Sequence, residues 1–499
     1  MTAANVLVVG AGPTGLSAAY HLGEDALLVE RDREVGGVCR PTVVDGFTFD
    51  QAGHIMFSND PYVNELYVKL LGDNLHWQNR EAWIYSKKVY TRYPFQGSLY
   101  GLPPAVIREC LSGAIRARYG DWRATIERPH TNGHVNGAST NGCAKPGESI
   151  HDCCADGILE AEVPLAIANG TTAPNDEPRN FEEFIYRVWG AGIAKHFAIP
   201  YNRKLWAVPL DEMETSWLGG RVPLPDLDEM IDGALAPVPK PMGPNARFGY
   251  PLRGGFQALM SGFLPHLRGP LKLGTSLTSV DPNAHLATFS DGTTVRYDVL
   301  VSTIPLPELV RNIGDDAPEQ VRHDAQSLRR VSVRCVNLGI GRERLTDKHW
   351  IYYPEDTVFH RIFVQGNASP ECNPPGGFGL TCEITYAESK PLPCQGDALI
   401  ARCIDDCRRV GIITDDDPVW TAFMTDIPYA YVVYDHARAG RVRRVRDWLH
   451  QRDILLAGRY SEWEYYNSDH AFVAGRNAAQ QAQGRRAPAA SNAEPVTGA

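Results

Sequence analysis

VLVVGAGPTG, at residues 6–15, is the most informative stretch of this chain. An apolar run leads into three glycines, a segment of small residues follows, and a second apolar run ends at Glu30. A strand, tight turn, helix and second strand in this order form a unit that binds a dinucleotide. Gly10 permits the turn, Gly12 lets the backbone approach a pyrophosphate, and Gly15 lets the helix pack closely on the strand. Glu30 lies where a carboxylate accepts hydrogen bonds from a ribose.

A second glycine pair, Gly36-Gly37, follows the predicted ribose carboxylate, and Arg40 comes shortly after it. This extension resembles the FAD-binding motif of the large flavoprotein family that contains amine oxidases and protoporphyrinogen oxidase. Simple nicotinamide dehydrogenases usually lack the extension. The resemblance therefore favours FAD as the cofactor.

Length, charge and cysteine content limit the other options. The 499 residues are too many for one ordinary core, so two or three lobes are expected. The 49 basic and 59 acidic residues give a net charge of −10, which argues against a nucleic-acid partner. The eleven cysteines show no C-x-x-C and no paired metal spacing, so we expect reduced thiols and no metal site. No apolar run approaches the ~20 residues of a membrane span, and the first strand leaves no room for a signal peptide. We expect a soluble, cytoplasmic protein with no membrane partner.

The order of the expected elements predicts an α/β fold with a discontinuous, Rossmann-like FAD-binding domain. An apolar strand at residues 299–305 returns the chain to the nucleotide-binding sheet. Alternating residues between 331 and 434 predict an antiparallel β-sheet lobe. The predicted domains are the FAD-binding domain at 1–100, 240–310 and 446–483, a helical lobe at 101–128 and 179–239, and the sheet lobe, which carries the substrate, at 311–445.

Two segments lack the patterns of ordered structure. Residues 129–178 are rich in Asn, Gly, Thr, Ala and Pro, which predicts a disordered or loosely attached insertion with one short helix at 156–163. Residues 484–499 are predicted to form a flexible tail.

Polar and aromatic residues gather at several places more densely than packing requires. His54 follows the small residues Ala52 and Gly53, and it is equally consistent with a residue beside the flavin and with a satisfied buried histidine. A candidate substrate wall comprises Tyr201, Asn202, Lys204 and Trp206.

The chain resembles the UDP-galactopyranose mutase family, especially its longer eukaryotic-type members, over nearly its whole length except the insertion and the tail. The matching blocks are VLVVGAGPTGL, AGHIMFS, YPFQ, PYNRKLWAVP, GPNARFGYPLRGG, WIYYPED, GRYSEWEY and NSDHAF. The resemblance implies an FAD domain, a helical lobe and a sheet lobe, with the substrate lying over the flavin.

In that family FAD works only in its reduced form, although the net reaction involves no redox change. Flavin N5 attacks the anomeric carbon and displaces the nucleoside diphosphate, and the opened sugar recloses through a different hydroxyl before the nucleotide returns. The resemblance implies an isomerase that interconverts a nucleotide-linked hexopyranose and hexofuranose, such as UDP-galactopyranose and UDP-galactofuranose. It also implies a nucleotide-sugar partner, with NAD(P)H as a candidate reductant and a homo-oligomer as a candidate assembly.

The matching blocks also assign site residues by resemblance. The catalytic group comprises His54, Arg361, Tyr352, Tyr429 and Tyr465. In the family the backbone carbonyl of the histidine receives the flavin N5 proton, and the arginine pairs with the diphosphate. The cofactor-binding group comprises Gly10, Gly12, Pro13, Thr14, Gly15, Glu30, Arg31, Gly37, Val38, Gly53, His54, Leu277, Gly458, Arg459, Tyr465 and Ser468. The substrate-binding group comprises Tyr93, Phe95, Gln96, Tyr201, Asn202, Trp206, Asp226 and Arg361.

Four positions depart from the family pattern. Ile199 stands where a second diphosphate-binding arginine is expected, and Ala52 replaces the first of two glycines. Asp226 replaces an asparagine and Ala368 a tyrosine. Losing one of two arginines weakens the binding of a dianion by about 2–3 kcal/mol. Either another cation compensates or the substrate is a different nucleotide sugar, and the candidate cations are Arg203, Lys204 and Arg253.

Two other functions stay open. One is an FAD-dependent oxidoreductase that resembles amine or porphyrinogen oxidases, and the other is a flavin-binding protein without catalysis. The matching blocks that line the sugar pocket in the mutase family favour a mutase over an oxidoreductase. The substituted pocket residues are consistent with a flavin-binding protein without catalysis.

Overall fold

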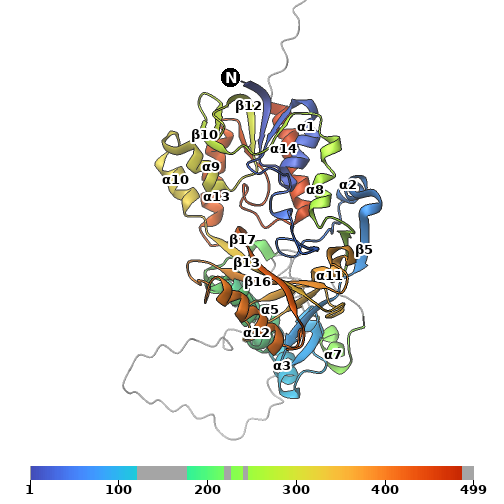
Figure 1. Cartoon of the computed structure of the whole chain (residues 1–499). Coiled ribbons are helices and arrows are strands. Elements are labelled where there is room, and N and C mark those ends of the chain that lie inside the picture. Colours follow the sequence, from blue (N-terminus) through green and yellow to red (C-terminus); the bar gives the residue numbers. More distant parts are fainter. Residues whose placement is uncertain (1, 121–176, 219–225, 240–245, 486–499) are drawn as a thin grey trace, which may run out of the picture.

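The computed structural model in Figure 1 describes residues 2–120, 177–218, 226–239 and 246–485. Nearly all of the predicted insertion, with its short helix, and the predicted tail beyond residue 485 lie outside the described residues. The described part contains two seven-stranded sheets, one in the upper and one in the lower half of the view (Figure 1).

The upper sheet has a Rossmann-like arrangement. Its strands are β1 (Thr2–Val9), β2 (Ala26–Val29), β9 (Leu271–Lys272), β10 (Leu277–Asp281), β11 (Leu286–Phe289), β12 (Thr294–Ser302) and β18 (Ile454–Leu456). They run in the order β10-β11-β12-β1-β2-β9, with β18 beside β12. All pair in parallel except the β10-β11-β12 meander. Because the strands come from three separate stretches of the chain, the predicted discontinuous α/β fold is confirmed.

Two helices from opposite ends of the chain pack together on this sheet. They are α1 (Pro13–Leu22) and α14 (Ser468–Arg485). The Ser17 hydroxyl in α1 donates to the Phe472 carbonyl oxygen in α14 at 2.7 Å. A Cβ on Gly475 would overlap the backbone of α1, so glycine allows this close approach. α14 therefore lies directly behind α1 and the glycine-rich turn that precedes it.

Three helices flank the other edge of the upper sheet. They are α9 (Leu306–Ile313), α10 (Glu319–Gln326) and α13 (Arg438–His450). α9 contacts β10, α13 contacts β18, and α10 contacts both helices. Residues 311–326 and 438–445, which sequence patterns assign to the sheet lobe, thus lie beside the nucleotide-binding sheet.

The lower sheet is mostly antiparallel. Its strands, in spatial order, are β17 (Val419–Val432), β13 (Arg330–Ile340), β16 (Phe378–Tyr386), β15 (Arg361–Phe363), β14 (Trp350–Tyr352), β6 (Ala82–Ser86) and β7 (Val89–Arg92). β6 pairs with β14 in parallel. The hairpin β6–β7 comes from residues that sequence patterns place in the FAD-binding domain. Its alternating burial is that of a strand with one face in a core, but the partner strand lies far along the chain.

In the helical lobe, the backbones of two helices are in direct contact. The lobe contains α3 (Pro104–Tyr119), α5 (Phe181–Ile193), α6 (Ile199–Trp206) and α7 (Leu227–Leu235). A Cβ on Gly113, Gly190 or Gly192 would overlap the backbone of the facing helix, so three glycines let α3 and α5 meet closely. The remaining elements include α2 (Pro61–Leu71), α8 (Gln257–Ser261), α11 (Gln365–Ala368), α12 (Asp397–Arg409), and the small sheets of β3 (Thr42–Val44) with β4 (Phe47–Phe49) and β5 (Leu75–Asn79) with β8 (Arg247–Pro251).

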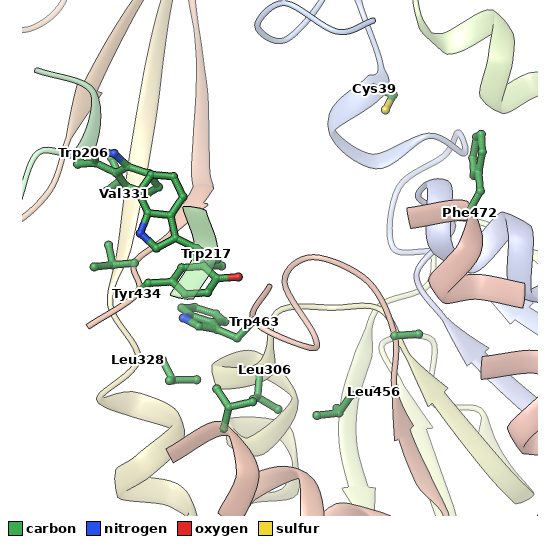
Figure 2. Close-up of a cluster of buried hydrophobic side chains, with 14 of the residues drawn as sticks. Cys39, Trp206, Trp217, Leu306, Leu328, Val331, Tyr434, Leu456, Trp463 and Phe472 are labelled. Carbon is green, nitrogen blue, oxygen red and sulfur yellow. The ribbon is translucent and has the colours of Figure 1, made fainter. Parts of the chain in front are cut away.

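A continuous core joins the lobes. Figure 2 shows Trp206 of α6, Trp217, Tyr434 and Trp463 close together, where the helical lobe meets the part of the chain that follows β17. The rings of Trp206 and Trp217 lie 4.9 Å apart in an edge-to-face arrangement. In the described ranges, the helices are all too short or too polar to cross a membrane.

Candidate functional site

The first glycine turn leaves room for a ligand at the start of α1. Gly10 has a φ of 99°, a conformation that favours glycine. A Cβ on Gly15 would overlap the Gly10 carbonyl oxygen, so glycine is needed for α1 to start this close to β1. At Gly12, no described atom lies within 4 Å of the position that a Cβ would take. α1 begins at Pro13, and the N–H groups of its first turn point at this open space.

Glu30 closes the turn from the side. It is 6% exposed, and its two carboxylate oxygens accept the N–H groups of Ala11 at 2.6 Å and Asp32 at 2.9 Å. The Thr275 N–H donates to the Glu30 carbonyl oxygen at 2.8 Å, which brings the start of β10, with Leu277, close to the same carboxylate. Each carboxylate oxygen keeps a further lone pair for a ribose hydroxyl.

The loop after Glu30 folds back over the turn. A Cβ on Gly37 would lie 3.4 Å from the Gly12 Cα, so the two glycines adjoin. Arg40 donates to Asp32 at 2.6 Å and to the Gly37 carbonyl oxygen at 3.1 Å, which holds the loop. The Arg31 side chain is 75% exposed, and its Nε lies 3.7 Å from the Asp32 carboxylate of the same loop.

The Gly53–His54 backbone is fixed between the two sheets. The Gly53 N–H donates to Glu383 at 3.2 Å, and a Cβ on Gly53 would lie 2.7 Å from Trp350 Nε1. The His54 ring stacks on Phe256 with centroids 5.2 Å apart, and its Nδ1 is buried with no hydrogen-bond partner in the described part of the chain. Burial lowers the pKa of His54 to about 4, so the ring is neutral at pH 7.

Three more predicted cofactor residues border the same region. Val38 packs against apolar residues of β13 and β17. The Ser468 hydroxyl donates to the Ile55 carbonyl oxygen at 3.2 Å, which ties α14 to the segment after His54. Gly458 has a φ of 88°, and a Cβ there would overlap the side chain of Thr14.

Arg459 presents a buried cation with unused donors. Its guanidinium lies 4.8 Å from the ring centroid of Tyr465 and 5.2 Å from that of Tyr431. One Nη donates to the Tyr466 carbonyl oxygen at 3.1 Å, while Nε and the other Nη are buried without a partner among the described residues. Buried donors of this kind are costly unless a ligand satisfies them.

These features fit a flavin dinucleotide. The turn at Gly10–Gly15 would hold the pyrophosphate, Glu30 the adenosine ribose, and the His54 backbone together with Arg459 the flavin ring.

Arg361 and Glu383 form a buried ion pair next to that region. Glu383 is fully buried, Arg361 is 18% exposed, and one Glu383 oxygen accepts both Nε at 3.0 Å and one Nη at 2.5 Å. His360 Nε2 lies 3.8 Å from Glu383. Burial and Arg361 hold the pKa of His360 well below its usual range, so the histidine is neutral and Arg361 is the charged partner. The other Arg361 Nη remains for a ligand.

Tyrosines surround the Arg361 guanidinium. Tyr352 is the cross-strand neighbour of Arg361, and its ring stacks on Tyr93 at 5.1 Å. Tyr201 meets Tyr352 edge to face at 5.5 Å, and Tyr431 stacks parallel to Tyr465 at 6.1 Å. Burial, followed by the neighbouring Tyr352, raises the pKa of Tyr93 to about 12, so this phenol keeps its proton at neutral pH. The structure thus brings Tyr93, Tyr201, Tyr352, Tyr465 and Arg361 together.

Trp206 and three smaller predicted substrate residues lie in the wall behind this cluster. Trp206 is 1% exposed, and its ring lies 5.8 Å from that of Tyr431. Phe95 stacks on the adjacent helical lobe, and the Asn202 side chain donates to its own helix at the Ala198 carbonyl oxygen. Gln96 is 5% exposed. Phe95 and Asn202 thus shape the wall, whereas Trp206 Nε1 is a buried donor without a partner among the described residues.

Two predicted site residues are engaged elsewhere. The Tyr429 hydroxyl donates to Glu308 in α9 at 2.7 Å. Asp226 is the N-cap of α7, and its carboxylate accepts the Glu229 N–H at 3.0 Å. A carboxylate at this position therefore has a structural role, since N-caps are commonly Asp or Asn.

The cations proposed to replace the missing arginine are also engaged elsewhere. Ile199 is 7% exposed in the core. Arg203 is 62% exposed and lies 3.5 Å from Glu182. Lys204 donates to two carbonyl oxygens and to Thr357, and Arg253 is exposed. Ala368 is fully buried, with no room for a tyrosine unless its surroundings shift.

The sequence patterns miss two residues of the cluster, Glu383 and Arg80. Glu383 lies in a buried strand and Arg80 in a loop between two strands. Arg80 donates to the Tyr352 hydroxyl at 2.8 Å. Tyr431, by contrast, alternates with Tyr429 along β17, and this period-two pattern is visible in the sequence.

Comparisons with known proteins agree with this fold. Residues 8–70 match the NAD(P)-binding Rossmann-like domain, and residues 203–483 match the flavin containing amine oxidoreductase family. A crystal structure of reduced UDP-galactopyranose mutase is 26% identical, with a TM-score of 0.81 over 97% of this chain and 94% of that one.

More distant structures share the fold alone. A putrescine oxidase bound to putrescine is 15% identical, with a TM-score of 0.60 over 96% of this chain and 99% of that one. A fatty acid isomerase from P. acnes is 14% identical, with a TM-score of 0.60 over 96% and 98%. An uncharacterized protein from the nifH2 3′ region of Methanothermococcus thermolithotrophicus is 44% identical over 59 residues, which cover 11% of this chain and 57% of that protein.

Proposed function

The chain belongs to the flavin-containing amine oxidoreductase family, and on that premise we propose that it is a flavin-dependent mutase that interconverts a nucleotide-linked hexopyranose and hexofuranose. The observation that carries this proposal is the tyrosine-lined Arg361 beside the Gly53–His54 backbone. An arginine that is 18% exposed and lies among phenols suits a diphosphate and a sugar, both rich in oxygen acceptors. The similarity to the crystal structure of a reduced UDP-galactopyranose mutase supports the same proposed function.

When bound and reduced, the flavin would supply the nucleophile for the anomeric carbon of the sugar. The chain's own residues would position the reactants. Arg361 would donate from its remaining Nη to the departing diphosphate, while Glu383 keeps the guanidinium in place. The hydroxyl of Tyr352, next to Arg361, would donate to phosphate or sugar oxygens.

The Gly53–His54 backbone would fix the distance between the flavin ring and the sugar. Glu383 holds the Gly53 N–H, and the indole of Trp350 leaves no room for a side chain there. His54 is neutral at pH 7, so its ring is no proton donor at that pH. Since the proposed reaction consumes no net proton, this arrangement needs no protein acid–base pair.

Ring contraction tests the proposal directly. The FAD-loaded protein, reduced under anaerobic conditions, is incubated with UDP-galactose and with GDP- and dTDP-hexoses, and the furanose products are resolved by chromatography and NMR. We expect one nucleotide sugar to be converted by the reduced protein and not by the oxidised protein. If no sugar changes ring size, or if the oxidised protein works equally well, the proposal is wrong.

An oxidase is the second candidate, because the matching family is one of amine oxidoreductases. It predicts rapid anaerobic bleaching of the flavin by an organic amine such as putrescine. We expect no such bleaching, since Glu383, the buried carboxylate beside the tyrosine cluster, is already paired with Arg361 and is not available to bind an ammonium group. Fast bleaching without ring contraction would favour the oxidase.

A further inference from the structure

We propose that the Lys204 ammonium group positions Tyr201 against Tyr352, and that the nucleotide-sugar site is fully formed only while this lysine carries its proton. The inference rests on the proposed function and adds a control by pH to the same site. Lys204 lies three residues after Tyr201 in α6, on the helical lobe. Its side chain reaches the segment that directly follows Tyr352 at the end of β14, on the sheet lobe. The lysine therefore links the two lobes beside the contact between the two tyrosine rings, which lie 5.5 Å apart.

The Lys204 ammonium group has three donors and meets three acceptors. It donates to the carbonyl oxygens of Tyr353 and Glu355, each at 2.9 Å, and to Thr357 Oγ1 at 2.8 Å. The Thr357 hydroxyl donates its own proton to the Phe359 carbonyl oxygen at 2.6 Å, so toward Lys204 it can only accept. A neutral amine has two N–H groups and a lone pair, and the lone pair would face one of these oxygens. The arrangement therefore requires the protonated lysine.

Two side chains of the sheet lobe hold the same turn of α6 by its backbone. The Thr385 hydroxyl in β16 and the Lys390 ammonium group both donate to the Lys204 carbonyl oxygen, the latter at 3.0 Å. Since α6 ends at Trp206, this carbonyl oxygen has no partner within the helix. α6 is therefore fastened to the sheet lobe at Lys204 through both its side chain and its backbone.

The surroundings of Lys204 bring the loss of its proton close to neutral pH. Burial, followed by the neighbouring Lys390, lowers the pKa of Lys204 to about 7. Burial also lowers the pKa of Lys390, to about 8, so Lys390 loses its proton later as the pH rises. The titratable side chains that face Lys204 are Lys390 and Arg409, which lower its pKa, Asp406 and Asp356, which raise it, and the neutral His360. Lys204 is therefore the first of the two lysines to release α6.

The contact between Tyr201 and Tyr352 forms one side of the proposed site, since Tyr352 is the cross-strand neighbour of Arg361. Once Lys204 is neutral, one of its three oxygen contacts becomes repulsive, and α6 is held less firmly beside β14. If binding requires the protonated form, the apparent dissociation constant rises as that form is lost. The expected rise between pH 6 and pH 8 is about tenfold.

Titration calorimetry on the oxidised, FAD-loaded protein at pH 6, 7 and 8 tests this inference. The ligands are UDP-galactose, GDP-mannose and dTDP-glucose, which have no terminal phosphate group that titrates in this range. The variants are Lys204→Met, Thr357→Val and Lys87→Met. Lys87 is the matched control, because it is 37% exposed and contacts only the Glu355 side chain of the same segment, at 2.6 Å. A flavin spectrum and content equal to the wild type show that each protein is folded at each pH.

For the wild type, we expect the affinity for the preferred nucleotide sugar to fall about tenfold from pH 6 to pH 8. Binding at pH 7 should take up about half a proton, measured in buffers of different ionisation enthalpy. Lys204→Met binds about tenfold more weakly than the wild type at pH 6 and shows neither effect. Thr357→Val leaves two acceptors for the two N–H groups of the neutral amine, so its pH dependence is smaller. Lys87→Met behaves like the wild type.

If the wild type binds equally well at pH 6 and pH 8, or if Lys204→Met keeps the full pH dependence, the inference is wrong and the proposed function stands. The same holds if the dependence is lost in Glu462→Gln, since the pKa of Glu462 is also about 7. Should Lys204→Met fail to hold FAD, Thr357→Val decides, and a pH dependence equal to that of the wild type overturns the inference. If the wild type binds no nucleotide sugar at any pH, the proposed function falls and this inference falls with it.

Discussion

Replacing Glu383 with glutamine removes one charge from the middle of the site and leaves its shape intact. The glutamine oxygen can still accept the Gly53 N–H, which the carboxylate accepts at 3.2 Å. Arg361, however, loses the carboxylate that accepts two of its donors at 3.0 and 2.5 Å. The variant therefore isolates the effect of charge from that of packing.

The size of the effect follows from burial. Removing one partner of a buried ion pair typically costs about 3–5 kcal/mol, because the other charge is left uncompensated. Glu383 is fully buried and Arg361 is 18% exposed. Since Arg361 keeps some contact with water, we expect the lower end, a loss of about 3 kcal/mol in the free energy of unfolding.

Urea unfolding followed by tryptophan fluorescence measures this loss. Glu355→Gln is the control, because Glu355 forms an ion pair with Lys87 in which both side chains are well exposed, 41% and 37%. An exposed pair contributes about 0–1 kcal/mol. The double variant Arg361→Gln, Glu383→Gln should lose less than Glu383→Gln alone, since no unpaired charge remains. If Glu383→Gln loses no more than the control, the ion pair is not the stabilising contact inferred here.

Three further predictions concern the cofactor end and pH. Glu30→Ala removes the carboxylate that accepts the Ala11 N–H at 2.6 Å and that is predicted to bind the ribose. FAD should therefore be lost on dialysis about 10- to 100-fold more readily than from the wild type. Absorbance at the flavin band measures this loss. Gly15→Ala should purify without FAD, because its Cβ would overlap the Gly10 carbonyl oxygen; full flavin content would contradict this. Burial raises the pKa of Glu462 from 4.5 to about 7. The folded state then binds its proton more tightly than the unfolded chain, so its contribution to stability is complete below about pH 4.5 and is lost as pH rises through about 7. Thermal midpoints of the wild type relative to Glu462→Gln should therefore fall across that window, and a constant difference would refute the shift.

Local sequence chemistry was enough to predict the dinucleotide end. Gly10, Gly12, Gly15 and Glu30 carry their information within one short unit. Gly10 supplies the positive φ of the turn, Gly15 clears the Gly10 carbonyl oxygen, and Gly12 leaves space for a ligand. The predicted Rossmann-like fold follows from that unit and from the apolar strand at 299–305, and the structure confirms it.

The substrate end was less predictable because its contacts are long-range. Glu383 meets Gly53 across 330 residues, and Arg80 meets Tyr352 across 272. No periodicity marks such pairs. Asp226 shows a local role that resemblance did not indicate, because it caps α7; its contact with the substrate stays a prediction.

The parallel pairing of β6 with β14 also has a consequence for the synthesis of the chain. Ala82 leaves the ribosome 268 residues before its partner Trp350. At roughly 5–20 residues per second, the β6–β7 hairpin waits on the order of tens of seconds with an open edge. Such an edge invites pairing with other nascent chains. The two lysines at its turn, Lys87 and Lys88, place positive charge at the tip of the hairpin during that wait. We therefore expect aggregation through the β6 edge to be confined to chains in which residue 350 has not yet emerged.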